Sequence, residues 1–370
     1  MHTNDPCSEI LHLNNSQKSE AMPSVTPIYQ VSGFEAGSEF FYTRKNNPNA
    51  AELESIVAKL ENSKYALAFT TGMTSIFSCL NLLRPGNKVL ICSKIYGCSF
   101  KLFQIYCKQH DINLDIKDLT NIDYKTINVS YDMCFFETPT NPFLNVIDIQ
   151  NISKACKAKN KNCLIVVDNT WATMLYQKPL KCGADITVYS GSKYFGGHTD
   201  VMSGFITTNN ESIYEKLKTI RFYGGLILSP ESAWLTRRSF QTLKLRIMRQ
   251  SITTKWMAKK LETFPQINKI YYPKIDGKQL EGYGGIIFID VTDELISRYG
   301  EVLRKLKLFG TGTGMACVTS MIAQPYTGSH ASLTDKEKAD MGIRPNLLRL
   351  CFGLEEPEDL LNDLKTAFSK

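Results

Sequence analysis

Lys193 lies in a segment, Tyr189–His198, that surrounds one lysine with small, hydroxyl-bearing and glycine residues. The segment directly follows a short apolar run that is typical of a β-strand. A lysine amine can form a Schiff base with an aldehyde cofactor, and such chemistry needs an acid facing the cofactor ring. A single lysine in a strand-to-loop turn is more commonly a solvated surface residue. The other residues of the chain must therefore decide between these two interpretations.

Six short apolar runs alternate with helical patterns in the first two thirds of the chain. Because they are bounded by turns, they indicate strands covered on both faces, and hence an α/β fold with a mostly parallel sheet and right-handed crossovers. In such sheets ligands bind beyond the carboxyl ends of the strands. The runs are Tyr65–Phe69, Lys88–Cys92, Asp132–Phe136, Cys163–Val167, Ala184–Tyr189 and Ser203–Thr207.

The residues that follow these runs each have a structural and a functional interpretation. Asp168 either caps the next helix or holds a protonated pyridine nitrogen of a cofactor. Tyr96 is either a core aromatic or the stacking partner of a cofactor ring. Gly72 and Met73 open a helix predicted to continue to about Leu83, and its free N–H groups and dipole favour a phosphate. Chemistry-capable residues thus recur at the same end of successive predicted strands.

Several motifs between Pro23 and the C-terminus occur together in one enzyme family. They are Pro27–Gln30, Tyr42–Arg44 with Asn47–Pro48, Glu137–Pro142, Val167–Thr170, Ser190–His198, Thr242–Arg246 and Leu348–Leu350. On these motifs the chain resembles the Cys/Met-metabolism (transsulfuration) family of enzymes that depend on pyridoxal 5'-phosphate (PLP). The family includes cystathionine γ-synthase, cystathionine β- and γ-lyases, methionine γ-lyase and O-acetylhomoserine sulfhydrylase. The resemblance implies the fold of PLP-dependent transferases (aspartate aminotransferase-like, fold type I).

The resemblance also implies a role for each matching residue. Lys193 would form the Schiff base with PLP, and Asp168 would face the pyridine nitrogen. Tyr96 would stack on the ring and act as acid or base near the leaving group. Asn141 and Arg349 would hold the substrate carboxylate. The implied phosphate ligands are Gly72, Met73, Ser190 and Ser192, together with Tyr42 and Arg44 of a neighbouring subunit.

The resemblance leaves the reaction open among several related activities. We expect γ-replacement or γ-elimination, as in cystathionine γ-synthase or γ-lyase, with cystathionine β-lyase or methionine γ-lyase activity as alternatives. Cys98 resembles methionine γ-lyases, but Arg221–Gly225 lacks the Lys-Asp pair expected of them. Gly314 stands where the family has a serine near the substrate. More distant alternatives are a PLP-dependent aminotransferase and a catalytically silent PLP-binding protein.

The order of the patterns predicts three parts of the chain. An arm over residues 1–45, irregular to Met22 and then extended, would contribute to the active site of a neighbour. A PLP-binding domain would cover residues 46–228. A smaller C-terminal α/β domain would cover residues 229–370, so that a substrate bound by Arg349 bridges both domains. The elements predicted in this domain are a helix over Glu231–Leu261, strands over Gly284–Val291 and Asn346–Phe352, and a helix over Pro357–Phe368.

Composition narrows the class of protein further. The chain has 370 residues and a net charge of +7 that is spread along the sequence, so we expect no nucleic-acid binding. No run approaches about 18 uninterrupted apolar residues, so we expect no membrane partner. The five histidines form no ligand-spaced cluster, and we expect no metal site. The eleven cysteines are expected to be reduced. The N-terminus lacks the pattern of a secretory signal, so we expect a cytoplasmic enzyme, and the resemblance implies a homodimer that pairs into a homotetramer.

Overall fold

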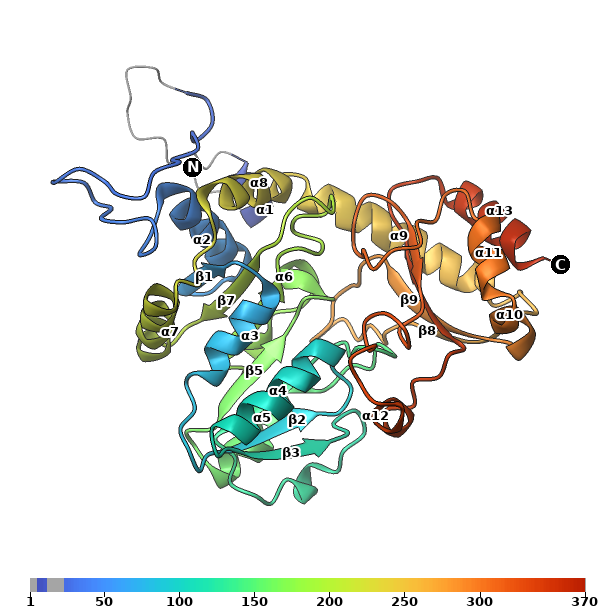
Figure 1. The fold of residues 1–370 in the computed structure, drawn as a ribbon, viewed down its shortest axis with the longest axis horizontal. Helices are drawn as coiled ribbons and strands as arrows, with labels where there is room; N and C mark the ends of the chain where they lie inside the picture. The colour runs from blue at the N-terminus through green and yellow to red at the C-terminus, as the bar shows by residue number, and fades with distance from the viewer. Residues whose placement is uncertain (1–4, 12–22, 370) are drawn as a thin grey trace.

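A seven-stranded sheet forms the larger part of the computed structural model, which describes residues 5–11 and 23–369 (Figure 1). Its strand order is β1-β7-β6-β5-β4-β2-β3. The antiparallel strand β7 separates β1 from β6, and the other neighbours pair in parallel. The strands are β1 Tyr65–Phe69, β2 Lys88–Cys92, β3 Asn113–Lys117, β4 Met133–Glu137, β5 Leu164–Asp168, β6 Ile186–Ser190 and β7 Gly204–Thr208.

The direction of these strands brings the carboxyl ends of all of them except β7 to one edge. Strands β1 and β6 run the same way because both are antiparallel to β7. Strands β2, β4 and β5 are linked to β6 by parallel pairing. The residues that follow β1, β2, β4, β5 and β6 therefore meet at the same edge, as the apolar runs predicted.

All six predicted strands are present, and two of them have the predicted bounds. The other four are displaced by one or two residues at their ends. Strand β3 was not predicted because it lies at the edge of the sheet, where Asn113, Asp115 and Lys117 leave no apolar run. The predicted α/β class with a mostly parallel sheet is confirmed.

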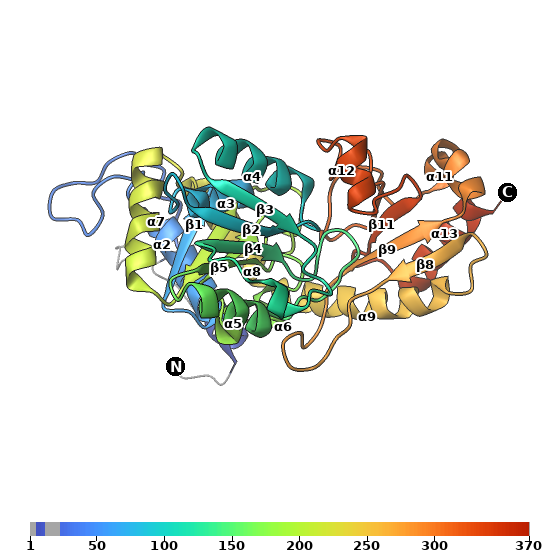
Figure 2. The same cartoon turned by 90° about the horizontal axis from the view of Figure 1, so that it is seen from below.

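Helices cover both faces of this sheet, with α3 and α4 on one side and α5 on the other (Figure 2). Asn47 caps α2, whose first residue is Pro48, and Asn62 ends it in a left-handed conformation. Contrary to the prediction of an irregular arm, residues 6–10 form a short helix, while 12–22 lie outside the described residues. The helices are α1 Pro6–Ile10, α2 Pro48–Glu61, α3 Gly72–Leu80, α4 Gly97–Gln109, α5 Ile149–Lys159, α6 Thr173–Tyr176 and α7 Glu211–Gly224.

A four-stranded antiparallel sheet, in the order β10-β11-β9-β8, follows in the C-terminal part. Its strands are β8 Ile267–Tyr271, β9 Ile286–Val291, β10 Met321–Ala323 and β11 Leu347–Cys351. The predicted strands correspond to β9 and β11, whereas the short edge strand β10 and the half-exposed edge strand β8 were missed. The division into domains at residue 229 stays a prediction, although α8 begins at Pro230.

The predicted single helix over Glu231–Leu261 is wrong, because it is two helices, α8 Pro230–Phe240 and α9 Leu243–Leu261. Arg246 satisfies the end of α8 by donating from Nη2 to the Ser239 carbonyl at 2.9 Å, and its Nε contacts the Thr242 hydroxyl at 3.1 Å. The remaining helices are α10 Asp293–Ser297, α11 Tyr299–Lys305, α12 Asp335–Asp340 and α13 Pro357–Phe368, the last as predicted.

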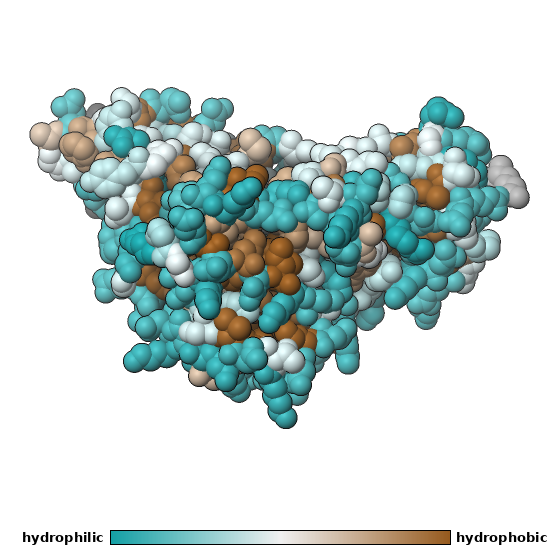
Figure 3. Space-filling model, turned by 60° about the horizontal axis from the view of Figure 1, so that its bottom comes forward, coloured by the Kyte–Doolittle hydropathy of each residue, from teal (hydrophilic) through white to brown (hydrophobic). Residues whose placement is uncertain are grey.

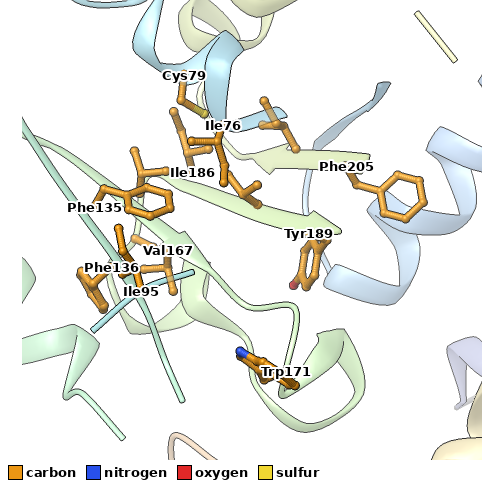
Figure 4. Close-up of a cluster of buried hydrophobic side chains, with 14 of the residues drawn as sticks. Ile76, Cys79, Ile95, Phe135, Phe136, Val167, Trp171, Ile186, Tyr189 and Phe205 are labelled. Carbon is orange, nitrogen blue, oxygen red and sulfur yellow. The ribbon is translucent and has the colours of Figure 1, made fainter. Parts of the chain in front are cut away.

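The buried hydrophobic side chains form two clusters, and the larger one also includes Ile286 and Phe288 of β9 in the second sheet. The larger cluster packs Phe135, Val167 and Ile186 of the first sheet against Ile76 and Cys79 of α3 (Figure 4). The face drawn in Figure 3 is mainly hydrophilic, with patches of hydrophobic residues between the polar ones. All eleven cysteines are free thiols. Among the described residues, no helix is long and apolar enough to cross a membrane.

Candidate active site

Two groups of opposite charge lie at neighbouring strand ends of the first sheet. Asp168 is the last residue of β5, and Lys193 follows the last residue of β6, Ser190. Thr170 donates to Asp168 Oδ1 from its backbone N–H at 3.0 Å and from its hydroxyl at 2.6 Å. Burial raises the pKa of Asp168, while Thr170 and Lys193 lower it. Burial also lowers the pKa of Lys193, and the charge of Arg349 lowers it further, against Asp168.

The N-terminus of α3 lies directly against the end of β6. The Thr71 hydroxyl caps the helix by accepting the N–H of Thr74 at 3.0 Å. A Cβ on Gly72 would lie 2.8 Å from Ser190 Cβ, so this close approach requires glycine. The first-turn N–H groups of Gly72 and Met73 have no acceptor within the helix. They lie beside Ser190, where an anion would find several donors.

Ser192, another predicted phosphate ligand, is held by the neighbouring strand. Its hydroxyl accepts the Ser203 N–H at 3.0 Å and lies 3.4 Å from the Ser203 carbonyl. This contact fixes the turn before Lys193. A role of the Ser192 hydroxyl toward phosphate stays a prediction.

Tyr96 immediately precedes α4, so its position depends on the start of that helix. Its backbone N–H donates to Oε1 of the buried Glu137 at 2.7 Å. Burial raises the pKa of the Tyr96 hydroxyl, the neighbouring Cys98 raises it further, and Arg349 lowers it. The Tyr96 hydroxyl therefore keeps its proton at neutral pH, and it lies close enough to Arg349 of the second sheet to feel the charge of that arginine.

Arg349 is buried in the middle of β11 and is held by a loop of its own part of the chain. Its Nη2 donates to the carbonyls of Thr313 at 3.2 Å and Gly314 at 3.3 Å, and Nη1 lies 3.7 Å from Met315 Sδ. Within the described residues, Arg349 Nε and Asn141 Oδ1 are buried without a hydrogen-bond partner. Unsatisfied buried polar atoms of this kind are uncommon and suit a polar ligand.

Tyr42 and Arg44 lie apart from this cluster in the single chain. Arg44 Nη1 donates to the Phe222 carbonyl at 3.2 Å, and its guanidinium lies 4.7 Å from the Phe222 ring centroid. Both residues are exposed, in a segment that loops away from the two sheets (Figure 1). Their predicted role in a neighbouring subunit therefore stays a prediction.

Three buried residues at the site received no role from the sequence. Thr170 holds Asp168, Glu137 holds Tyr96, and His330 contacts the Ile95 carbonyl at 3.2 Å. Glu137 had a usable signal, because a charged residue ends an otherwise apolar run. His330 had none, since it lies far along the chain in a loop. In the part of the chain that the structure describes, no cluster of His, Cys, Asp or Glu is placed to hold a metal ion.

Comparisons with known proteins agree with the motifs. A family model described as "Cys/Met metabolism PLP-dependent enzyme" matches residues 8–369. A cystathionine β-lyase of Lactococcus lactis is 34% identical over 359 residues, covering 93% of each chain. A cystathionine γ-lyase of Bacillus subtilis is 32% identical over 356 residues, covering 92% of this chain and 93% of that one.

A solved structure gives the same family. The cystathionine γ-synthase from Xanthomonas oryzae superposes with a TM-score of 0.93 at 29% identity, covering 99% of this chain and 98% of that one. That protein has also been solved in complex with cystathionine. The fold expected from the motifs is confirmed by this similarity.

Proposed function

Because the chain belongs to the Cys/Met-metabolism family of PLP-dependent enzymes, we propose that it eliminates or replaces the sulfur-bearing or oxygen-bearing group at Cγ of an amino acid, with cystathionine as its first candidate substrate. One observation carries the proposal. Lys193 and Asp168 lie at the ends of the paired strands β6 and β5. The charge of Arg349, which comes from the other sheet, lowers the pKa of the same lysine. The proposed reaction needs a lysine that can hold an aldehyde cofactor and a cation that can bind the substrate carboxylate, and this arrangement has both.

The residues at the strand edge fit PLP. The buried Asp168 uses Oδ1 for Thr170, and its raised pKa indicates a carboxylate that a cationic pyridine nitrogen would stabilise. The start of α3 offers free N–H groups beside Ser190, which suits the phosphate. Lys193 would hold the aldehyde. When bound, PLP supplies an electron sink for a carbanion at Cα of the substrate.

Lys193 is the residue that moves the Cα proton in this proposal. A lysine amine can accept a proton only when it is neutral. Burial and the charge of Arg349 lower the pKa of Lys193 and so increase the neutral fraction near neutral pH. Once the substrate amine has displaced Lys193, the free lysine amine can remove the Cα proton and return a proton elsewhere on the substrate.

Arg349 and Asn141 are proposed to hold the substrate carboxylate. The fixed Nη contacts of Arg349 with Thr313 and Gly314 orient the guanidinium, and its Nε remains as a buried donor. A planar guanidinium binds carboxylate with defined geometry. Fixing the carboxylate orients the bonds at Cα and Cγ relative to Lys193.

Tyr96 is proposed to protonate the leaving group. Because burial and Cys98 raise the pKa of its hydroxyl, Tyr96 carries its proton at neutral pH. A protonated hydroxyl can donate a proton to a departing thiolate, and it can act as a base only after it has lost that proton. This sharpens the sequence-based expectation, which left both roles open.

Elimination at Cβ of cystathionine is the second candidate activity. It is favoured by the 34% identity to the Lactococcus lactis cystathionine β-lyase over 359 residues. Chemistry at Cγ is favoured by the structural similarity to the Xanthomonas oryzae γ-synthase, with a TM-score of 0.93. Both reactions begin with the same proton removal at Cα and use the same residues.

Product analysis separates these activities. The purified holoenzyme is incubated with cystathionine, methionine, cysteine, and O-acylhomoserine plus cysteine, and the products are identified by mass. Elimination at Cγ of cystathionine releases cysteine, 2-oxobutyrate and ammonia, whereas elimination at Cβ releases homocysteine, pyruvate and ammonia. Replacement at Cγ forms cystathionine from O-acylhomoserine and cysteine. A keto acid that retains the whole substrate skeleton would instead indicate an aminotransferase.

We also propose that two subunits complete each site and that two such dimers form a tetramer. Support comes from Tyr42 and Arg44, which are both exposed, and from Arg44, which contacts Phe222 of α7 rather than the Lys193 cluster. A cytoplasmic location is proposed because all eleven cysteines are free thiols. Solution mass measurement would test the assembly, and mixing R44A with K193A subunits would test a shared site, since hybrids should regain activity.

A further inference from the structure

The peptide unit that joins Ile95 to Tyr96 is held at both of its polar ends by buried side chains. Its carbonyl oxygen, on Ile95, lies 3.2 Å from Nε2 of His330. Its N–H, on Tyr96, donates to Glu137 Oε1 at 2.7 Å. Glu137 ends β4 of the first sheet, whereas His330 lies between β10 and α12 in the C-terminal part. One peptide plane is thus fixed from two separate regions of the chain.

The contacts of His330 define its tautomer. A carbonyl oxygen can only accept a hydrogen bond, so Nε2 carries a proton toward Ile95. Nδ1 lies 3.0 Å from the Ser329 hydroxyl and accepts from it. Burial lowers the pKa of His330 to about 4, against the hydrogen bonds to the backbones of Ile95 and Asn141. His330 is therefore a neutral donor that cannot easily change its role.

Gly97 makes this contact possible. A Cβ at this position would lie 2.7 Å from the Ser329 carbonyl oxygen and 2.9 Å from His330 Cα. Any larger residue would therefore push the His330 loop away from the start of α4. The loop itself is ordered by backbone bonds from His330 N–H to the Pro325 carbonyl at 3.0 Å and from Leu333 N–H to the His330 carbonyl at 3.1 Å.

Glu137 is held as firmly on the other side. It is fully buried and pairs in register with Asp168 on the neighbouring strand. Burial and the charge of Asp168 raise its pKa, while the Tyr96 N–H and the Trp171 side chain oppose this by donating to it. Glu137 thus serves as an acceptor whose position is set by the sheet.

We propose that His330 and Glu137 are positioning residues that clamp the Ile95–Tyr96 peptide and thereby aim the Tyr96 hydroxyl at the leaving group. The inference rests on the proposed function, because it assigns Tyr96 the proton transfer. It also explains why a loop of the C-terminal part must pack on α4.

Substitution of His330 tests the clamp with matched variants. H330L removes the donor, whereas the longer amide of H330Q can still reach the Ile95 oxygen. H330L is expected to lower kcat about 10- to 100-fold, because small misplacement of a reacting group is costly, with bound-PLP absorbance kept. H330Q is expected to retain most of kcat. H110L serves as the control, because His110 is exposed at the far end of α4.

A double-mutant cycle with Y96F separates positioning from general stability. If His330 acts through the Tyr96 hydroxyl, H330L should cost less than about 3-fold in kcat when that hydroxyl is already absent. Equal losses in both backgrounds would overturn the proposal. So would a loss in H330Q as large as that in H330L. If H330L does not fold, H330N replaces it, since its shorter amide cannot reach Ile95.

The cycle is measured on whichever elimination or replacement the wild-type holoenzyme catalyses. If the wild type forms none of these products, the proposed function fails before the clamp is tested. If the wild type is active but the two substitutions are additive, the clamp fails while the proposed function stands. E137Q gives a further check because it keeps one acceptor oxygen for the Tyr96 N–H, so it should lose less kcat than H330L.

Discussion

The two sheets contribute to the site in different ways. The seven-stranded sheet supplies Lys193 and Asp168 from residues at its strand ends, where the backbone direction alone brings them to one edge. The four-stranded sheet supplies Arg349 from the middle of a strand and His330 from a loop. The first contribution depends on local chain geometry. The second exists only because the two parts of the chain pack together.

Substitutions in the two regions should therefore impair the enzyme in different ways. Changes at the first sheet should remove the chemistry or the cofactor. Changes in the second should leave the cofactor bound and disturb substrate binding or alignment.

K193A should abolish the reaction, with a loss in kcat of at least about 10⁴-fold, because it removes the amine proposed to move the Cα proton. The visible absorption of covalently held PLP should disappear as well. K161A is the matched control, since Lys161 is exposed in a loop. Activity and absorption that both survive in K193A would contradict the central assignment.

D168N should lower kcat about 100- to 1000-fold, because an amide cannot stabilise a cationic ring nitrogen as a carboxylate does. The side chain keeps its size and can still accept from Thr170, so folding should be little affected. Steady-state kinetics with the PLP absorption spectrum would check this. A change confined to KM would place Asp168 at the substrate and not at the cofactor.

R349A should raise KM about 100-fold, which corresponds to about 3 kcal/mol of lost substrate binding. PLP content should stay close to that of the wild type, since Arg349 comes from the second sheet. R349K should recover part of the loss, because the charge is kept without the planar fork. Lost PLP with an unchanged KM would remove the distinction between the two regions.

E61Q concerns stability in the first region and should leave catalysis nearly unchanged. Glu61 is buried, burial raises its pKa to about 7, and Lys178 and the Tyr189 hydroxyl oppose this. In the unfolded chain Glu61 loses its proton near its ordinary pKa of 4.5, whereas in the folded protein it keeps the proton up to about pH 7. The free energy of unfolding should therefore fall as pH rises from 4.5 to 7. The loss is about 3 kcal/mol at most.

Urea unfolding at several pH values would check this prediction. E61Q imitates the protonated side chain, so its free energy of unfolding should vary less between pH 4.5 and 7 than that of the wild type. A wild-type stability that rises over this interval would contradict the assignment. The matched control is E262Q, because Glu262 is exposed at the end of α9.

Much of the first sheet was predictable because burial on both faces leaves continuous apolar runs. Val89 to Cys92 are completely buried, and this strand was predicted with its observed bounds. The edge strand β3 was not predicted because three of its five residues are exposed and none is buried. The break between α8 and α9 was not predicted either, because no local breaker residue marks it. The end of α8 is instead capped by the side chain of Arg246.

The family, the cofactor and the strand ends that carry Lys193 and Asp168 can be predicted from the amino-acid sequence, because they depend on short motifs and on strand direction. The contacts of Glu137 and His330 with the two ends of one peptide beside Tyr96 became visible only once the chain was folded. The physical reason is that a hydrogen bond needs its partners within about 3 Å. Residues as distant in the chain as Ile95 and His330 meet that condition only through the packing of the two parts.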